Sequence, residues 1–145
     1  SDGFVFYSNY RSRKGGEIAE NPQVALTLWW PVLERQVRIG GAVEKVGPER
    51  SDTYFARRPR ASQLSAWASA QSSTVAGREE LEDQMEVARS RFEDQPVPRP
   101  DHWGGYRIDP AEIEFWQGQP HRLHDRIRYR RSEDGGSWVI ERLAP

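Results

Sequence analysis

Residues 23–30 read QVALTLWW and residues 34–46 read ERQVRIGGAVEKV, and these two runs are typical of β-strands. The first is rich in Val, Leu, Thr and Trp, residue types that β-strands favour. In the second, residues 35–39 alternate in character, as side chains do on the two faces of a strand. Gly40-Gly41 indicates either a β-bulge or the close approach of another backbone. We therefore expect neighbouring strands of one antiparallel sheet or barrel.

The segments outside these two runs predict a group of helices and further strands. Ser12 is placed to cap a helix, Pro48 to begin one and Pro59 to interrupt one. Helices are expected over residues 13–20, 49–57, 61–70 and 77–94, the last with an apolar face of Leu81, Met85, Ala88 and Phe92. Strands are expected over residues 4–8, 105–108, 112–117, 126–131 and 138–143. The order sheet, helices, sheet predicts an α+β fold, mainly β, with an antiparallel core.

Length and composition restrict the class of protein. With 145 residues, 36% of them hydrophobic and 11% aromatic, residues 1–145 should form a single domain. A net charge of -1 provides no global field that would attract nucleic acid or an anionic membrane. Cysteine is absent, and no apolar stretch approaches the ~20 residues that span a bilayer. We expect a cytoplasmic protein with no nucleic-acid or membrane partner.

Two groups of polar residues are suited to binding phosphate. Tyr7-Ser8 and Ser12-Arg13-Lys14 lie at a strand end and a helix start, where hydroxyls, cations and free N–H groups converge. A capped, solvated turn explains the same pattern. The second group, Tyr54, Arg58 and Ser62, combines a phenol, a guanidinium and a hydroxyl at spacings of four, with a bend at Pro59. Its alternative is a solvated arginine-rich turn.

The third group lies near the end of the chain, around Trp116. Arg122, His124 and Arg126 would share one face of an extended run, because side chains in a strand repeat with period two. Such a face would meet an anion or an electron-rich ring. The three histidines lack zinc-protease spacing, and there is no phosphate-binding Gly-rich loop or nucleophile elbow. We therefore expect no metal site.

A set of longer motifs runs through the chain in order. They are FVFYSN (4–9), SRK (12–14), LERQV (33–37), RRPRASQL (57–64), AWASAQSS (66–73), WGGYR (103–107) and FWQGQPHRLHDR (115–126). In this order they resemble the motifs of the pyridoxamine 5'-phosphate oxidase family. The resemblance implies an α+β, mainly β, split β-barrel with antiparallel strands and flanking helices. It also implies a homodimer with flavin mononucleotide (FMN) at the subunit interface, and residues 103–145 as a dimerisation and substrate-ring segment.

The resemblance assigns roles to individual residues. It implies flavin contacts from Tyr7, Ser8, Arg13, Lys14, Gln36, Gln71, Ser72, Trp116 and Arg126. It places the substrate phosphate on Tyr54, Arg58 and Ser62. Arg122 and His124 would lie against the substrate ring and be the catalytic pair. The implied reaction is oxidation of pyridoxamine or pyridoxine 5'-phosphate to pyridoxal 5'-phosphate by O2, with release of H2O2.

The beginning of the chain departs from the family pattern. The family carries an upstream Arg-x-Val-Leu-Leu-Lys type segment, whereas this sequence starts at Ser1 and enters its first expected strand at Phe4. We expect the sequence to begin inside a larger protein, with the domain incomplete at its N-terminus. Two alternatives stay open: an oxidase of another ring, as in phenazine biosynthesis, and a non-catalytic module that binds flavin or pyridoxal phosphate.

Overall fold

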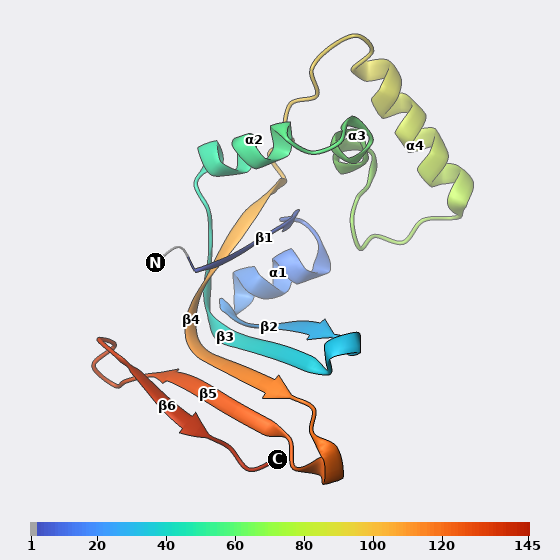
Figure 1. Cartoon of the computed structure of the whole chain (residues 1–145). Helices are drawn as coiled ribbons and strands as arrows, with labels where there is room; N and C mark the ends of the chain where they lie inside the picture. Colours follow the sequence, from blue (N-terminus) through green and yellow to red (C-terminus); the bar gives the residue numbers. More distant parts are fainter. Residues whose placement is uncertain (1–2) are drawn as a thin grey trace. The chain divides into compact units, whose positions relative to one another are not determined.

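The computed structural model describes residues 3–145, so Ser1 and Asp2, on which the expected interior start rests, lie outside the described residues. Figure 1 shows the helices and strands in chain order. They are β1 (Phe4–Asn9), α1 (Arg13–Glu20), β2 (Gln23–Trp30), η1 (Pro31–Leu33), β3 (Arg35–Lys45), α2 (Pro48–Ala56), α3 (Arg60–Ala68), α4 (Arg78–Arg91), β4 (Trp103–Gln117), η2 (Pro120–Arg122), β5 (Asp125–Arg131) and β6 (Trp138–Arg142). The strands form one sheet in the order β2-β3-β4-β5-β6, and β1 pairs with β4. The expected order of sheet, helices and sheet is confirmed.

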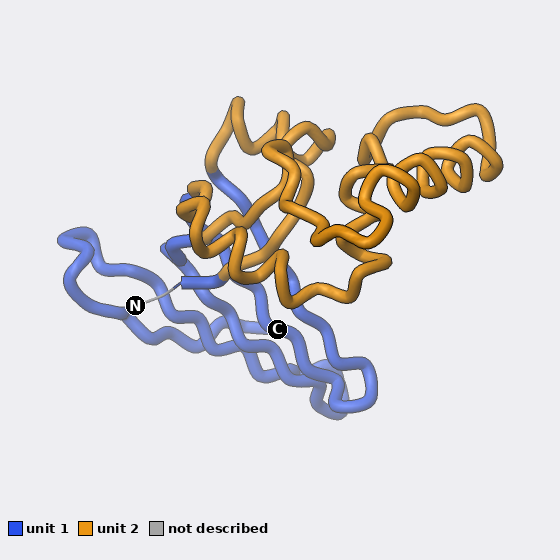
Figure 2. Tube along the Cα trace, turned by 90° about the horizontal axis from the view of Figure 1, so that it is seen from above, with its two compact units in different colours: residues 1–4, 23–43, 108–145 blue, residues 5–22, 44–107 orange. Residues whose placement is uncertain are grey.

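Two compact units make up the chain, shown in Figure 2. The sheet unit contains Gln23–Val43 and Ile108–Pro145, together with the start of β1. The helical unit contains Val5–Pro22 and Glu44–Arg107. Each unit is therefore built from segments that are far apart in the sequence.

The helical unit has a core of aromatic and aliphatic side chains. Its buried members are Phe55, Leu64, Ala66, Ala88, Phe92, Val97 and Trp103. Met85 packs against this core, but Leu81 is 41% exposed, so the apolar face expected on α4 is wrong at its first position. Helix α4 contributes to the core through Ala88 in its second half, and Phe92 follows directly after the helix. Within the described residues no helix is both long and apolar enough to cross a membrane.

Strand β4 is continuous, although the sequence predicts two short strands over residues 105–108 and 112–117. It runs from Trp103 to Gln117 and includes Pro110, which lacks the N–H group that a central strand uses. Strand β5 pairs with β4 from Glu112 onward, so the ladder between them begins beyond the proline. The expected break at residues 109–111 is therefore wrong.

The glycine pair in β3 marks a close approach of backbones. The β2–β3 register passes through Ala25–Gly40 and Val24–Gly41 without interruption, so there is no bulge against β2. A Cβ atom added to Gly41 would lie 2.1 Å from the carbonyl oxygen of Asp109, whereas one added to Gly40 would meet nothing within 4 Å. The alternative of close approach is confirmed for Gly41, and the bulge is excluded on this edge of β3.

Candidate functional site

A cleft in the helical unit gathers many of the residues expected to bind ligands. Its volume is about 410 Å³. The predicted residues that line it are Tyr7, Ser8, Lys14, Tyr54, Arg58 and Gln71. They come from the end of β1, the first turn of α1, the C-terminal part of α2, the turn between α2 and α3, and the loop after α3. The fold thus brings together residues from segments that are separate in the sequence.

The turn between β1 and α1 places a cation beside a hydroxyl. Ser12 Oγ accepts a hydrogen bond from Gly15 N at 3.2 Å and donates one to Asn9 O at 2.7 Å, so the expected cap is confirmed. Lys14 Nζ donates to Ser8 Oγ at 3.5 Å. Arg13 points elsewhere: its side chain is 84% exposed and pairs with Glu17 at 3.2 Å. Of the two adjacent cations, Lys14 lines the cleft and Arg13 does not.

The loop after α3 is tied to the end of β1 through Gln71. Its Oε1 accepts hydrogen bonds from Asn9 N at 3.2 Å and from Ser8 Oγ at 3.4 Å. Ser72, the next residue, has a left-handed backbone with φ 74° and is not among the lining residues. Gln71 therefore fixes the position of the cleft wall as well as belonging to it.

The group Tyr54, Arg58 and Ser62 is only partly brought together. Helix α2 ends at Ala56 and α3 begins after Pro59, so no single helix face carries all three. Tyr54 and Arg58 line the cleft, whereas Ser62 is absent from its lining and Ser65, one turn further along α3, is present. Sequence reasoning missed Ser65, although its spacing of three from Ser62 puts it on a neighbouring face.

Arg58 is held in this cleft by aromatic rings. Its guanidinium carbon lies 4.5 Å from the ring centroid of Trp103 and 5.6 Å from that of Phe55. Its Nη1 is buried and has no hydrogen-bond partner among the described residues. Desolvation lowers the pKa of Arg58, and the nearby Tyr54 opposes this. A half-buried guanidinium with a buried, unused donor fits an anionic ligand, because an unpartnered buried polar group is otherwise costly.

A stack of aromatic rings forms one wall of the cleft. The rings of Tyr7 and Tyr54 lie 3.7 Å apart between centroids, with an interplanar angle of 3°. The Trp103 ring lies 5.6 Å from Tyr7 and 6.2 Å from Tyr54 and is nearly parallel to both. Tyr7, an expected flavin contact, is therefore in direct contact with Tyr54, an expected substrate contact.

The remaining predicted residues belong to the sheet unit, where one expectation fails. Arg122 lies in the short turn η2, and His121 and Arg122 have left-handed backbones with φ 58° and 62°. Strand β5 begins only at Asp125. The expected extended run with Arg122, His124 and Arg126 on one face is therefore wrong, because Pro120 begins a tight turn there.

The ring of Trp116 contacts one imidazole ring and one other indole ring in the sheet unit. Its ring centroid is 4.8 Å from that of His124 and 5.8 Å from that of Trp29. Gln36 is paired with Trp29 in the β2–β3 register. His124 Nδ1 accepts a hydrogen bond from Gln119 N at 3.2 Å, which orients its ring. The Trp116 ring thus contacts His124 and Trp29, and Gln36 is the strand partner of Trp29.

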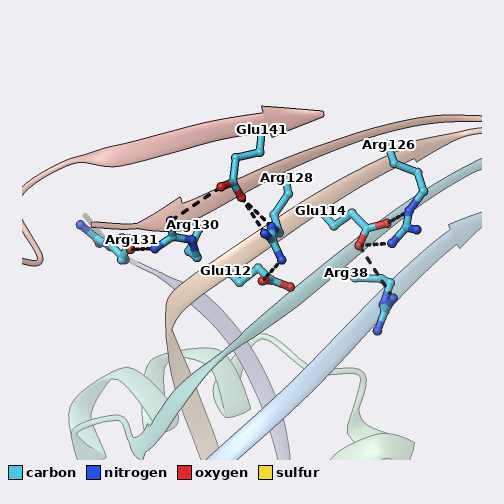
Figure 3. Close-up of polar contacts among 8 residues, drawn as sticks. All are labelled: Arg38, Glu112, Glu114, Arg126, Arg128, Arg130, Arg131 and Glu141. Carbon is cyan, nitrogen blue, oxygen red and sulfur yellow. Dashed lines mark hydrogen bonds and ion pairs between the residues drawn. The ribbon is translucent and has the colours of Figure 1, made fainter. Parts of the chain in front are cut away.

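Arg126 is fixed by a buried carboxylate that sequence reasoning missed (Figure 3). Arg126 Nε and Nη2 donate to the two oxygens of Glu114 at 2.8 and 3.1 Å, and Arg126 Nη1 donates to Ala144 O at 3.0 Å. Glu114 is 5% exposed, and Arg38 lies 3.8 Å from it. The hydrogen bonds from Arg126 hold the pKa of Glu114 below its usual value, although burial acts in the opposite direction.

The pair continues as a ladder of alternating charges across β4, β5 and β6. Arg128 donates to Glu141 at 2.7 Å and to Glu112 at 3.4 Å, and Arg130 lies 3.7 Å from Glu141. The sequence signal was the match of acids at every second position of β4 with arginines at every second position of β5. Within residues 3–145, no group of three or more His, Asp or Glu side chains is placed to hold a metal ion.

Comparisons with known proteins agree on one family. A family model described as "Pyridoxamine 5'-phosphate oxidase" matches residues 1–92, and one described as "Pyridoxine 5'-phosphate oxidase C-terminal dimerisation region" matches residues 103–145. The pyridoxine/pyridoxamine 5'-phosphate oxidase of Salinibacter ruber is 54% identical over 144 residues, which is 99% of this chain and 67% of that protein. The protein of the same name from Trichormus variabilis is 57% identical over 143 residues, 99% of this chain and 66% of its own length. The chain thus spans about two thirds of the curated relatives it matches.

Solved structures give the same fold. PhzG from Burkholderia lata, in complex with tetrahydrophenazine-1-carboxylic acid, superposes with a TM-score of 0.90 at 30% identity, over 99% of this chain and 69% of its own. A pyridoxamine 5'-phosphate oxidase-related, FMN-binding protein from Nostoc punctiforme gives 0.72 at 18% identity, over 97% of this chain and 72% of its own, and shows the fold alone. The family models and the curated relatives together establish that this chain belongs to the pyridoxamine 5'-phosphate oxidase family and has its split-barrel fold.

Proposed function

We propose that this chain is the main part of an enzyme that oxidises pyridoxamine or pyridoxine 5'-phosphate to pyridoxal 5'-phosphate. FMN would be the cofactor and O2 the acceptor, with H2O2 released; oxidation of the amine would also consume water and release ammonia. The observation that carries the proposal is the buried, unpartnered Nη1 of Arg58 in a cleft that also presents the phenol of Tyr54. Such a set of donors suits the phosphate monoester of a B6 vitamer.

The proposed substrate contacts fall into two groups. Arg58 and Tyr54 would bind the substrate phosphate, and we propose Ser62 as a third contact of that phosphate. Arg122 and His124 would hold the pyridine ring, with the imidazole already oriented by its hydrogen bond from Gln119. The contribution of these residues is positioning, which brings the reacting carbon to the cofactor in a productive orientation.

The proposed flavin contacts come from several segments of the chain. The proposed contacts in the helical unit are Tyr7, Ser8, Arg13, Lys14, Gln71 and Ser72, and those in the sheet unit are Gln36, Trp116 and Arg126. The residues fit the group, because Lys14 beside Ser8 offers cationic and hydroxyl donors for a phosphate and Trp116 offers a ring surface. When bound, FMN takes up two electrons from the substrate and passes them to O2.

We also propose a single-domain protomer that acts as a homodimer, with residues 103–145 contributing to the dimer interface. The match of these residues to the family's dimerisation region supports this part of the proposal.

The test is an oxidase assay of the purified chain with added FMN. We expect quenching of flavin fluorescence on binding, and O2-dependent formation of pyridoxal 5'-phosphate from pyridoxine 5'-phosphate. Unphosphorylated pyridoxine should be a much poorer substrate. Flavin binding without any turnover of either compound would favour a non-catalytic module instead.

Replacing Arg58 by Gln is expected to weaken binding of pyridoxine 5'-phosphate by roughly tenfold to a hundredfold, the range for losing a charge-assisted hydrogen bond. Flavin affinity should stay within about twofold, since Arg58 is assigned to the substrate alone. Isothermal titration with each ligand measures both quantities. Arg57→Gln is the matched control, because Arg57 is adjacent and exposed but does not line the cleft. Equal effects of the two substitutions would contradict the assignment of Arg58.

A second candidate is an oxidase of a larger, unphosphorylated ring. It is favoured by the likeness to PhzG at a TM-score of 0.90. Only the first candidate needs residues that bind a substrate phosphate. Turnover that is unaffected by Arg58→Gln would therefore favour an oxidase of an unphosphorylated ring. Oxidation of a reduced phenazine carboxylic acid in preference to pyridoxine 5'-phosphate would establish it.

A further inference from the structure

Trp103 is the first residue of β4 and is 7% exposed. Its indole ring lies in the wall of the cleft, 4.5 Å from the guanidinium of Arg58. No role follows for Trp103 from the proposed function, which assigns the phosphate to Arg58 and Tyr54. Its ring contact with Arg58 therefore needs its own explanation.

The way Arg58 is held differs from that of other arginines in the chain. Arg126 and Arg128 donate hydrogen bonds to carboxylates, and these carboxylates offset the positive charge of each guanidinium. Arg58 instead lies over the faces of Trp103 and Phe55. An aromatic face attracts a guanidinium electrostatically without using any of its N–H donors and without cancelling its charge. Arg58 is thereby positioned with its donors still available for a ligand.

Trp103 is itself firmly placed relative to α2, the helix that carries Tyr54. Arg99 Nη1 donates to Trp103 O at 2.7 Å, and Arg99 Nε contacts Asp52 of α2 at 2.6 Å. The buried Ser51, also on α2, accepts a hydrogen bond from Gly105 N at 3.1 Å. The start of β4 and the helix α2 are thus joined at two points, which holds the ring at a fixed place beside Arg58.

We propose that Trp103 is a positioning residue for phosphate recognition, its indole face holding Arg58 so that the guanidinium keeps its donors and its full charge for a phosphate monoester. This inference rests on the proposed function of the cleft. Its contribution should be confined to ligands that carry a phosphate, because the ring acts through Arg58. The desolvation that lowers the pKa of Arg58 is consistent with a guanidinium held off solvent by aromatic faces.

The test compares pyridoxine 5'-phosphate with pyridoxine in titrations of the whole chain. Trp103→Leu should weaken binding of the phosphorylated ligand by about tenfold, with the affinity for pyridoxine within about twofold. Trp103→Phe keeps a ring with a weaker face and should lose about threefold. In the Arg58→Gln background, Trp103→Leu should cause no further loss, which is the signature of action through Arg58.

Trp138→Leu serves as the matched control, since Trp138 makes a similar contact with Arg131 at 4.4 Å in the β5–β6 hairpin. It should leave both affinities unchanged. Melting temperatures report the folding of each variant. If Trp103→Leu does not fold, the role of Trp103 is tested instead with Trp103→Phe, alone and combined with Arg58→Gln. Equal losses for both ligands, or additive losses in the double variant, would overturn the role of Trp103. A native chain that binds the two ligands equally would overturn the proposed function, and the role of Trp103 with it.

Discussion

Gly41→Ala is expected to destabilise the protein by more than about 3 kcal/mol, beyond the usual range for overpacking. The added Cβ would lie 2.1 Å from Asp109 O and 2.9 Å from both Ala111 N and the Cα of Pro110. These are backbone atoms, so relief requires β3 and β4 to move apart, with loss of hydrogen bonds between them. Urea unfolding followed by circular dichroism measures the change.

Gly40→Ala is the matched control for this effect. The two glycines are adjacent, but a Cβ on Gly40 would meet nothing within 4 Å. Its effect should stay within about 1 kcal/mol, because no clash arises and alanine restricts the unfolded chain more than glycine does. Similar unfolding midpoints for the two variants would show that the close approach at Asp109 does not constrain the fold.

Arg126→Met should cost about 3 kcal/mol at pH 7, because it leaves the buried carboxylate of Glu114 without its bidentate partner. Arg38, at 3.8 Å and exposed, can compensate only in part. Arg130→Met is the control: its contact with Glu141 is 3.7 Å long and more exposed, so the loss should be below about 1 kcal/mol. Comparable losses of stability for both variants would mean that the burial of Glu114 does not determine how much its ion pair stabilises the protein.

The same pair predicts a dependence on pH. Glu114 has a pKa below its usual value near 4.5, so its stabilising effect is full above that pH and is lost as the pH falls through the lower folded-state pKa. The difference between native protein and Arg126→Met should therefore be largest near neutral pH and shrink in acid, where Glu114 is protonated in both. Unfolding curves from pH 7 down to about pH 3 test this, and a constant difference would contradict it.

Local signals in the sequence were enough for most of the elements. Ser12 followed by a short helical run predicted α1 from Arg13 to Glu20, and the composition of residues 23–30 predicted β2, both as observed. Pro110 led to the wrong prediction of a break in β4. A strand tolerates proline where the neighbouring strand does not pair with it, and β5 pairs with β4 only from Glu112 onward. The run after Pro120 misled for a related reason: the left-handed backbones of His121 and Arg122 are set by the turn that leads into β5.

The site was predictable in its residue types more than in its contacts. Tyr7, Lys14 and Arg58 were found from their chemistry, and the structure places them around one cleft. Glu114 and Trp103 were missed as site residues because their importance arises from contacts with residues distant in the sequence, Arg126 and Arg58 respectively. Neither a buried acid nor a strand-initial tryptophan is distinctive in the sequence until strand pairing and helix packing are known.

The distance along the chain between β3 and β4 has a consequence for synthesis. The two strands are neighbours in the sheet, yet all of residues 46–102 lies between them. A ribosome releases the β2–β3 hairpin long before β4 exists, with the edge of β3 unpaired and with Leu28 and Trp30, exposed even in the finished fold, on its surface. The nascent hairpin therefore exposes an unpaired strand edge during synthesis, and we expect slower production at low temperature to raise the soluble yield.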